Sequence, residues 1–200
     1  MSRPEGRRER KRRQTLDHLA DTAWSLFEAQ GYEAVTMEAI AEAADVAKGT
    51  LYKHFPVKEA LLRHHFHREL AAGMPDLLAE LAALPTAAAR LRGFLDASAE
   101  WSIRNRAHLV PYLRLRWSEV GVPYDLNSPH RSGMEQIFTG LIRQGQESGE
   151  FRRDLDTVTA AHYLEFLYVA ALLRWLNGAQ PDLHAEFHTM LDLYLRGMTP

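Results

Sequence analysis

Apolar residues recur at helical spacing from Gln14 almost to the end of the chain, and this periodicity constrains the fold more than any other feature. Leu19, Ala23 and Phe27 begin the pattern, on one face of a first helix that ends at Gly31. No stretch shows the sustained alternation that a half-buried strand requires. We therefore expect an all-α protein. Beyond Pro56, proline and glycine mark expected helices over residues 57–72, 76–84, 86–103, 105–120, 130–147, 156–176 and 182–196, with a loop at 121–129.

The composition of the chain excludes several classes of protein. The chain has 200 residues, 46% of them hydrophobic, and no cysteine. Without cysteine it can form no disulfide scaffold, cysteine nucleophile or thiolate metal site, which fits a reducing compartment. The longest apolar run, at residues 166–173, is far shorter than the ~20 residues of a membrane-spanning helix, and no apolar signal segment follows the first cations. We expect a cytoplasmic protein with no membrane segment.

The net charge of −2 conceals a strong asymmetry. Residues 1–13 carry seven Lys or Arg against two acids, a charge of +5, whereas residues 14–58 carry three Lys against seven acids, a charge of −4. All four lysines lie within the first 58 residues, and lysine is a flexible partner for phosphate. We interpret residues 1–13 as a basic flexible tail, which either is simply solvated or contacts nucleic acid.

Two short helices around a tight turn are predicted between Thr36 and Phe55. Thr36 is a suitable N-cap, and the chain then turns at Asp45, a residue type that tolerates left-handed backbone. Leu51 and Phe55 would anchor the second helix, which leaves Lys48, Gly49, Thr50, Lys53 and His54 on its other side. Backbone amides and the helix dipole favour phosphate there, and a glycine permits close approach of a ligand. The alternative is an ordinary helical hairpin with a polar face toward solvent.

This segment resembles the DNA-binding domain of the tetracycline-repressor (TetR) family. The resemblance covers about residues 14–62 and rests on Thr36, on VAKGTLYKHF at 46–55 and on KEAL at 58–61. It implies a helix-turn-helix DNA-binding domain at 14–60, followed by a larger helical effector-binding and dimerisation domain at 61–200. The DNA contacts that it implies come from Thr36, Ala47, Lys48, Gly49, Thr50, Tyr52, Lys53, His54 and Lys58. Arg12 and Arg13 of the basic tail would add phosphate or minor-groove contacts.

The chain departs from the family pattern at three positions. Ala47 stands where the family usually has serine or another polar residue, so a helix cap and one DNA contact are expected to be missing. Asp45 replaces the usual turn glycine, which causes strain if its φ is positive. Val57 replaces a small polar cap. A missing cap costs about 1 kcal/mol, so the expected consequence is an altered operator preference rather than a lost fold.

The resemblance also implies the function: a homodimeric repressor that binds a palindromic operator and is released by a small, largely apolar effector. The two subunits would meet through the helices at about 156–177 and 182–196. The sequence agrees, because a helix that is apolar on nearly all sides, as at 156–176, must be buried on more than one face.

The effector site is predicted from polar residues at apolar positions. Arg116 lies on an apolar stripe, and a buried guanidinium needs a partner, which is an acid such as Glu165, a carbonyl, or an anionic or polar group of a ligand. His162 raises the same question. The candidate ligand-binding residues are Trp101, Tyr112, Arg116, Trp117, His162 and Phe166, with Tyr124 and Phe138 as further aromatic candidates.

Other classes find little support in the sequence. The histidines at 64, 65 and 67 and the pair His184 and His188 lack the pattern of a metal site, so we interpret them as solvent-exposed and predict no metal and no cofactor. No phosphate loop, nucleophile elbow or zinc motif suggests an enzyme. The remaining alternative is a helical protein-interaction module without operator binding, which would tolerate neutralisation of Lys48 and Lys53.

Overall fold

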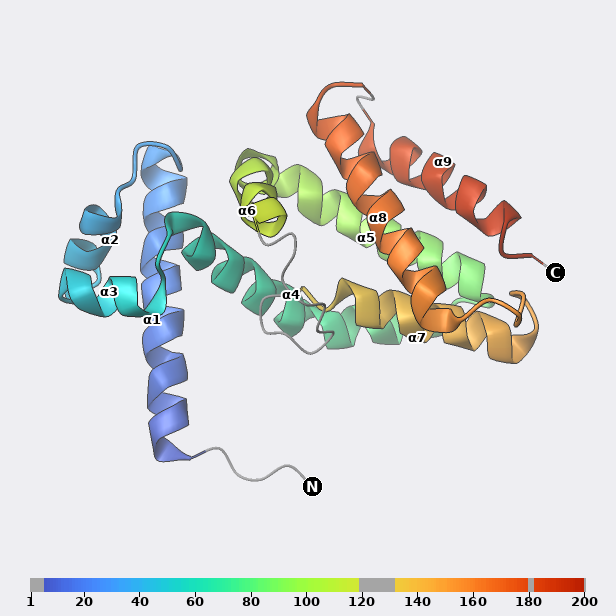
Figure 1. Ribbon diagram of the computed structural model, residues 1–200, viewed down its shortest axis with the longest axis horizontal. Coiled ribbons are helices and arrows are strands. Elements are labelled where there is room, and N and C mark those ends of the chain that lie inside the picture. Colours follow the sequence, from blue (N-terminus) through green and yellow to red (C-terminus); the bar gives the residue numbers. More distant parts are fainter. Residues whose placement is uncertain (1–5, 119–131, 180–181, 200) are drawn as a thin grey trace. The chain divides into compact units, whose positions relative to one another are not determined.

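The computed structural model describes residues 6–118, 132–179 and 182–199. These residues form nine α-helices and no strand, which confirms the all-α prediction (Figure 1). The helices are α1 (Arg7–Gln30), α2 (Met37–Ala43), α3 (Lys48–His54), α4 (Lys58–Ala82), α5 (Ala87–Arg104), α6 (Arg106–Ser118), α7 (Met134–Ser148), α8 (Thr157–Leu176) and α9 (Leu183–Arg196). The predicted loop at 121–129, including Tyr124, lies outside the described residues. Within them, no helix is long and apolar enough to cross a lipid bilayer.

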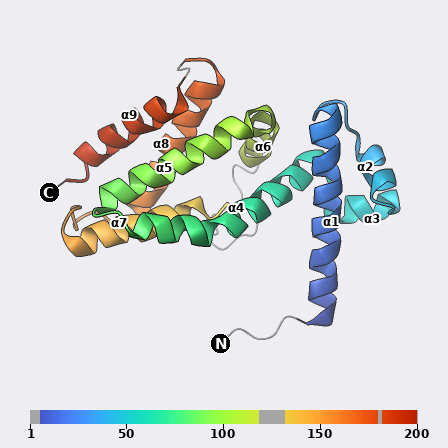
Figure 2. The same ribbon diagram turned by 180° about the vertical axis from the view of Figure 1, so that it is seen from behind.

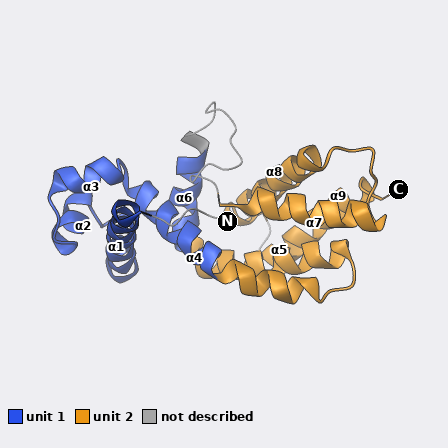
Figure 3. Ribbon diagram, turned by 90° about the horizontal axis from the view of Figure 1, so that it is seen from below, with its two compact units in different colours: residues 1–72, 107–122 blue, residues 73–106, 123–200 orange. Residues whose placement is uncertain are grey.

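The chain divides into two compact units (Figure 3). Unit 1 comprises residues 1–72 and 107–122, and unit 2 comprises residues 73–106 and 123–200. These units do not coincide with the expected domains at 14–60 and 61–200, because α6 and the first part of α4 belong to unit 1. The Trp24 ring accounts for part of this grouping, since it contacts both Phe66 of α4 and His108 of α6.

Unit 1 has its core where the apolar spacing predicts it. Leu19 and Phe27 of α1 are buried together with Ile40 of α2 and Leu51 of α3. α1 ends at Gly31, whose φ of 84° suits glycine. The start of α1 differs from the prediction, because residues 7–13 belong to the helix instead of forming a flexible tail. Arg, Lys and Glu are good helix formers, and extending an existing helix needs no new nucleus.

α4 runs without interruption from Lys58 to Ala82, so the predicted break between residues 72 and 76 is wrong. Pro75 lies inside the helix and removes one hydrogen bond. Packing in unit 2 compensates for the lost hydrogen bond. Leu81 is buried, and its side chain lies so close to Gly93 of α5 that a Cβ added to Gly93 would be only 2.7 Å from Leu81 Cδ2. This contact holds the end of α4 against α5, which sequence periodicity could not reveal.

Unit 2 is built on α5, α7, α8 and α9, which pack against one another (Figures 1 and 2). Phe138 of α7 lies at its centre and makes edge contacts with Phe94 of α5 and Tyr168 of α8. Tyr168 in turn stacks on Phe187 of α9, with ring centroids 4.8 Å apart. Three of these helices, α5, α8 and α9, begin at side-chain caps, and in α8 the carboxylate of Asp156 accepts a hydrogen bond from Thr159 N.

Candidate nucleic-acid interface

The α2–turn–α3 segment has the geometry of a helix-turn-helix. The Thr36 hydroxyl accepts a hydrogen bond from Ala39 N at 3.1 Å and so caps α2, as predicted. The chain then turns at Asp45, as predicted, and the φ of this residue is 53°, in the left-handed region. Val46 N donates to Ala41 O at 3.0 Å and closes the turn. α3 therefore begins at a position fixed by backbone contacts.

α3 has one buried side and one exposed side. Leu51 and the C-cap residue Phe55 are buried and face the core of unit 1. The predicted DNA-contacting residues of the opposite side are exposed: Ala47, Lys48, Gly49, Thr50, Tyr52 and Lys53, with His54 partly exposed. Ala47 is the N-cap and forms no side-chain cap, as predicted. The helix thus presents two cations, hydroxyls and bare backbone together at the surface.

Gly49 is not required by the protein itself. Its φ is not positive, and a Cβ at this position would meet no atom within 4 Å. A glycine inside a helix costs roughly 0.5–1 kcal/mol relative to alanine. Neither backbone geometry nor packing explains this glycine, and on an exposed face beside two lysines it leaves room for a binding partner to approach the backbone closely.

Glu38 was not among the predicted site residues, yet it lies beside two of them. Its Oε1 atom is 3.8 Å from Lys48 Nζ, and the Tyr52 hydroxyl donates to the same oxygen at 3.4 Å. These contacts join the first turn of α2 to α3. Sequence spacing could not reveal them, because the distance between two short helices depends on the turn.

Lys58 lies at the start of α4 and contacts the loop before α2. Its ammonium donates to Tyr32 O at 2.6 Å and to Val35 O at 2.8 Å, and lies 4.1 Å from the centroid of the Tyr32 ring. These bonds hold the segment that leads into Thr36. Lys58 therefore supports the interface from within unit 1, and its predicted contact with phosphate stays a prediction.

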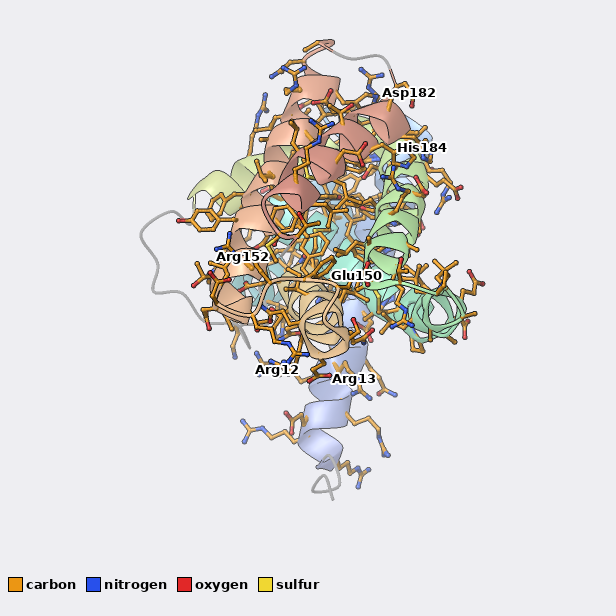
Figure 4. All side chains as sticks on the ribbon, turned by 90° about the vertical axis from the view of Figure 1, so that its right-hand side faces the viewer. Arg12, Arg13, Glu150, Arg152, Asp182 and His184 are labelled. Carbon is orange, nitrogen blue, oxygen red and sulfur yellow. The ribbon has the colours of Figure 1, made fainter. Side chains whose placement is uncertain are left out.

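Arg12 and Arg13 lie on the first part of α1, and both are exposed. Figure 4 labels them and shows long side chains projecting from this part of the helix. From Arg7 to Arg13 six of seven residues are basic, so the helix carries positive charge on all sides here. Residues 7–13 of the basic segment therefore form a helix rather than the predicted flexible tail.

The predicted ligand-binding residues are divided between the two units. Trp101, His162 and Phe166 belong to unit 2, whereas Tyr112 and Arg116 belong to α6 in unit 1. Trp117 also lies on α6, but its side chain is outside the described residues. Neither unit contains the whole set, so the effector site stays a prediction.

Several of these polar residues have partners that the sequence did not identify. His162 Nε2 lies 2.5 Å from Oε1 of the buried Glu135, across α7 and α8. Tyr112 Oη lies 3.0 Å from His67 Nε2. Phe166 differs from these, because its side chain is 62% exposed. His162 therefore contacts an acid of the protein itself, one of the kinds of partner expected for a polar residue at this position.

Two open depressions lie at the end of α7 in unit 2. One has a volume of about 570 Å³, and Phe151, Arg152 and Asp154 are among its lining residues. The other, of about 360 Å³, is lined by Arg143, Gln146, Glu147 and Arg153. Neither includes a predicted ligand-binding residue. Figure 4 shows Arg152 near this end of the unit.

Histidines of both groups contact acids of other helices, and those of α4 are largely covered, which corrects the prediction that both groups are simply solvent-exposed. His64 Nε2 lies 2.7 Å from Asp17 Oδ1, and the side chain of His65 is only 14% exposed. His184 and His188 both lie against Asp96 Oδ1, at 3.3 Å and 2.6 Å. Helix spacing shows that such residues share a face but not that another helix covers it. In the described part of the chain, no three such groups are arranged to hold a metal ion.

Comparisons of this chain with known proteins all point to bacterial transcriptional regulators. Residues 19–64 match the model of bacterial regulatory proteins of the tetR family. The chain is 26% identical over 184 residues to the fatty acid metabolism regulator protein of Bacillus subtilis (strain 168), covering 90% of this chain and 93% of the relative. It is 29% identical over 190 residues to the HTH-type transcriptional repressor KstR2 of Rhodococcus jostii (strain RHA1), covering 90% and 89%.

A solved structure extends the similarity to both units. Thermus thermophilus FadR, a TetR-family transcriptional repressor solved in complex with lauroyl-CoA, is 25% identical. The match covers 92% of this chain and 95% of that chain, with a TM-score of 0.75. The matched residues 19–64 contain the helix-turn-helix, and the matching folds include the helices of unit 2. Residues 19–64 therefore match the tetR family of bacterial regulatory proteins, and over most of its length the chain is similar to TetR-family transcriptional regulators.

Proposed function

We propose that the protein is a homodimeric transcriptional repressor that binds a palindromic operator through α3 and is released by a small effector with a large apolar part. The main support for DNA binding by α3 is Gly49. This helical glycine has open space around it and lies on an exposed face that includes Lys48 and Lys53. Such a face suits a duplex, because cations neutralise phosphates while bare backbone permits close approach. A regulator of this kind works beside the chromosome, so we also propose a cytoplasmic location.

The proposed dimer interface is an apolar surface on α8 and α9. The side chains of Tyr163, Phe166 and Leu193 are 63%, 62% and 66% exposed, and Leu167 beside them is 40% exposed. Tyr163, Phe166 and Leu167 are three and four residues apart, so they share one side of α8. An exposed apolar group of this kind marks an interaction site, and a second copy of the same surface would cover it in a symmetric dimer.

A symmetric dimer also explains a palindromic site. Two copies of α3 related by a two-fold axis would read two half-sites in opposite orientation, with centres about 34–36 Å apart or at a multiple of that distance. Phosphate contacts from α3, Thr36 and the basic start of α1 would fix the register, while Ala47, Gly49 and Lys53 would approach base edges.

The proposed effector class is a fatty acyl-CoA or a similar long-chain thioester. The support comes from two relatives, a fatty acid metabolism regulator and a FadR that binds lauroyl-CoA. Effector binding and operator binding would oppose each other through one coupling free energy, so each weakens the other by the same factor.

Selection of genomic fragments by the purified protein, followed by footprinting, tests the DNA-binding part. The proposal expects enrichment of a sequence with an inverted repeat and protection of both halves. A helical protein-interaction module would enrich no sequence even at low salt.

The effector part is tested on the operator recovered in this way. Lauroyl-CoA is expected to release the protein from the operator, whereas free CoA and laurate at equal concentrations serve as controls for its two halves. Release by none of the three would remove acyl-CoA from the proposal and leave operator binding in place.

A further inference from the structure

Glu38 places a negative charge on the surface that is proposed to meet DNA. Its side chain is 49% exposed, and the groups beside its Oε1 atom are Lys48 Nζ at 3.8 Å and the Tyr52 hydroxyl at 3.4 Å. Both partners belong to the exposed face of α3. The carboxylate therefore lies close to two groups that would contact DNA.

A carboxylate at this place competes with the DNA backbone. A phosphate cannot donate a hydrogen bond to Glu38, and the two anions repel each other. Lys48 and Tyr52 can interact with Glu38 or move to phosphate. Because both partners are largely exposed, the pair is weak, and the base contacts made on an operator are enough to break it, whereas exchanging Glu38 for a phosphate alone gains little.

We infer that Glu38 is a specificity-determining residue that holds Lys48 and Tyr52 away from phosphate in non-specific complexes and releases them only on the operator. This inference rests on the proposed DNA-binding function. On the operator, base contacts from α3 supply the free energy that breaks the pair. On other sequences these base contacts are absent, so Glu38 keeps its partners and binding stays weak.

The experiment compares wild type and Glu38→Gln on the footprinted operator and on a scrambled duplex of equal length, by fluorescence anisotropy across a range of salt concentrations. Glutamine keeps the size of the side chain and removes its charge. The expected result is about two- to fivefold tighter binding to the scrambled duplex, with a smaller change on the operator. The salt dependence on the scrambled duplex should steepen by about 0.9 in log–log slope, because Lys48 then neutralises one more phosphate.

Two controls separate this role from a general charge effect. Glu42→Gln makes the same change one turn further along α2, at another exposed glutamate, and is expected to leave the ratio of the two affinities as in wild type. In a Lys48→Ala background, Glu38→Gln should lose most of its effect on the scrambled duplex. Thermal unfolding of each variant confirms that it is folded.

Three outcomes would overturn the inference. They are equal effects of Glu38→Gln and Glu42→Gln, an undiminished effect without Lys48, and weaker binding of Glu38→Gln to both duplexes. If the wild type binds no duplex at all, the proposed DNA-binding function fails instead, so the two failures can be distinguished.

Discussion

The imidazole of His65 stacks on the indole of Trp24, with ring centroids 4.4 Å apart and planes inclined by only 11°. The ring of His108 is tilted against the same indole, with ring centroids 4.8 Å apart. Two histidines, one on α4 and one on α6, therefore hold a single tryptophan of α1. This arrangement joins α1, α4 and α6 of unit 1 through groups whose charge depends on pH.

Unit 1 is expected to lose stability on mild acidification. Burial lowers the pKa of His65 and also of His108, although Asp21 and Glu69 beside His65 and Glu28 beside His108 oppose the shift, and Arg68 beside His65 adds to it. Both residues bind fewer protons when folded than when unfolded. Their contribution is therefore complete above the unfolded pKa of about 6.5 and is lost as pH falls through the lower folded values.

The measurement is the free energy of unfolding between pH 7.5 and 5 for wild type and for the variant His65→Asn/His108→Asn. The variant should be less stable at pH 7.5 but should show a flatter pH dependence. His18→Asn, at an exposed histidine of α1, is the control and should keep the wild-type slope. An equal slope in all three proteins would contradict the predicted role of the buried pair.

Replacing Gly49 by alanine should separate stability from DNA binding. The added methyl group has open space in the free protein, so the helix should gain roughly 0.5–1 kcal/mol. Against a closely approaching duplex the same methyl would overlap, which should cost about 1 kcal/mol or more and weaken operator binding at least about fivefold. Denaturant unfolding and fluorescence anisotropy measure the two effects.

Gly73→Ala is the matched control, since Gly73 also lies in a helix with nothing within 4 Å of an added Cβ. It should stabilise the protein similarly and leave operator affinity unchanged. A Gly49→Ala protein with wild-type affinity would show that DNA does not approach this backbone.

Much of the fold follows from the sequence, because helix ends depend on local chemistry. Gly31 ends α1 and Thr36 begins α2, where capping rules place them. The positive φ of Asp45 fits its position in the turn. The continuation of α4 past Pro75 was not predictable from local rules. It depends on Leu81 packing at Gly93, a contact between residues in different helices.

Only part of the candidate site was predictable from the sequence. The exposed side of α3 follows from the spacing of Leu51 and Phe55, which sets the opposite face. Glu38 and the carbonyl bonds of Lys58 were missed, because each depends on how one element approaches another. Spacing alone assigns residues to faces but cannot say which residues meet.

Glu150 is expected to be important for the stability of unit 2. Its carboxylate accepts hydrogen bonds from Ala87 N at 2.6 Å and Ala88 N at 2.9 Å, at the start of α5. Figure 4 labels this residue. Glu150→Ala leaves two amides of the first turn without this acceptor and removes a charge that favours the helix dipole, so the free energy of unfolding should fall by roughly 1–3 kcal/mol. Glu147→Ala, at a nearby exposed glutamate, should change it by less than about 0.5 kcal/mol in the same denaturant titration.

Phe166→Glu should weaken the proposed dimer. Each copy would forfeit about 1.5–3 kcal/mol of apolar burial, and a symmetric interface contains the change twice, so the dimer Kd should rise roughly 100-fold or more. Sedimentation equilibrium measures it. Val110→Glu replaces another exposed apolar residue, on α6, and should leave the dimer intact. If the wild type sediments as a monomer at micromolar concentration, the proposed interface is wrong.

A salt titration of operator affinity tests whether the exposed side of α3 binds DNA. Wild type, Lys53→Ala and Arg104→Ala are compared, the last as an exposed arginine of α5 in unit 2. Wild-type affinity should fall steeply with salt, Lys53→Ala should bind more weakly with a slope reduced by about one, and Arg104→Ala should behave as wild type. A Lys53→Ala protein with both wild-type affinity and wild-type slope would show that this side of α3 does not bind DNA.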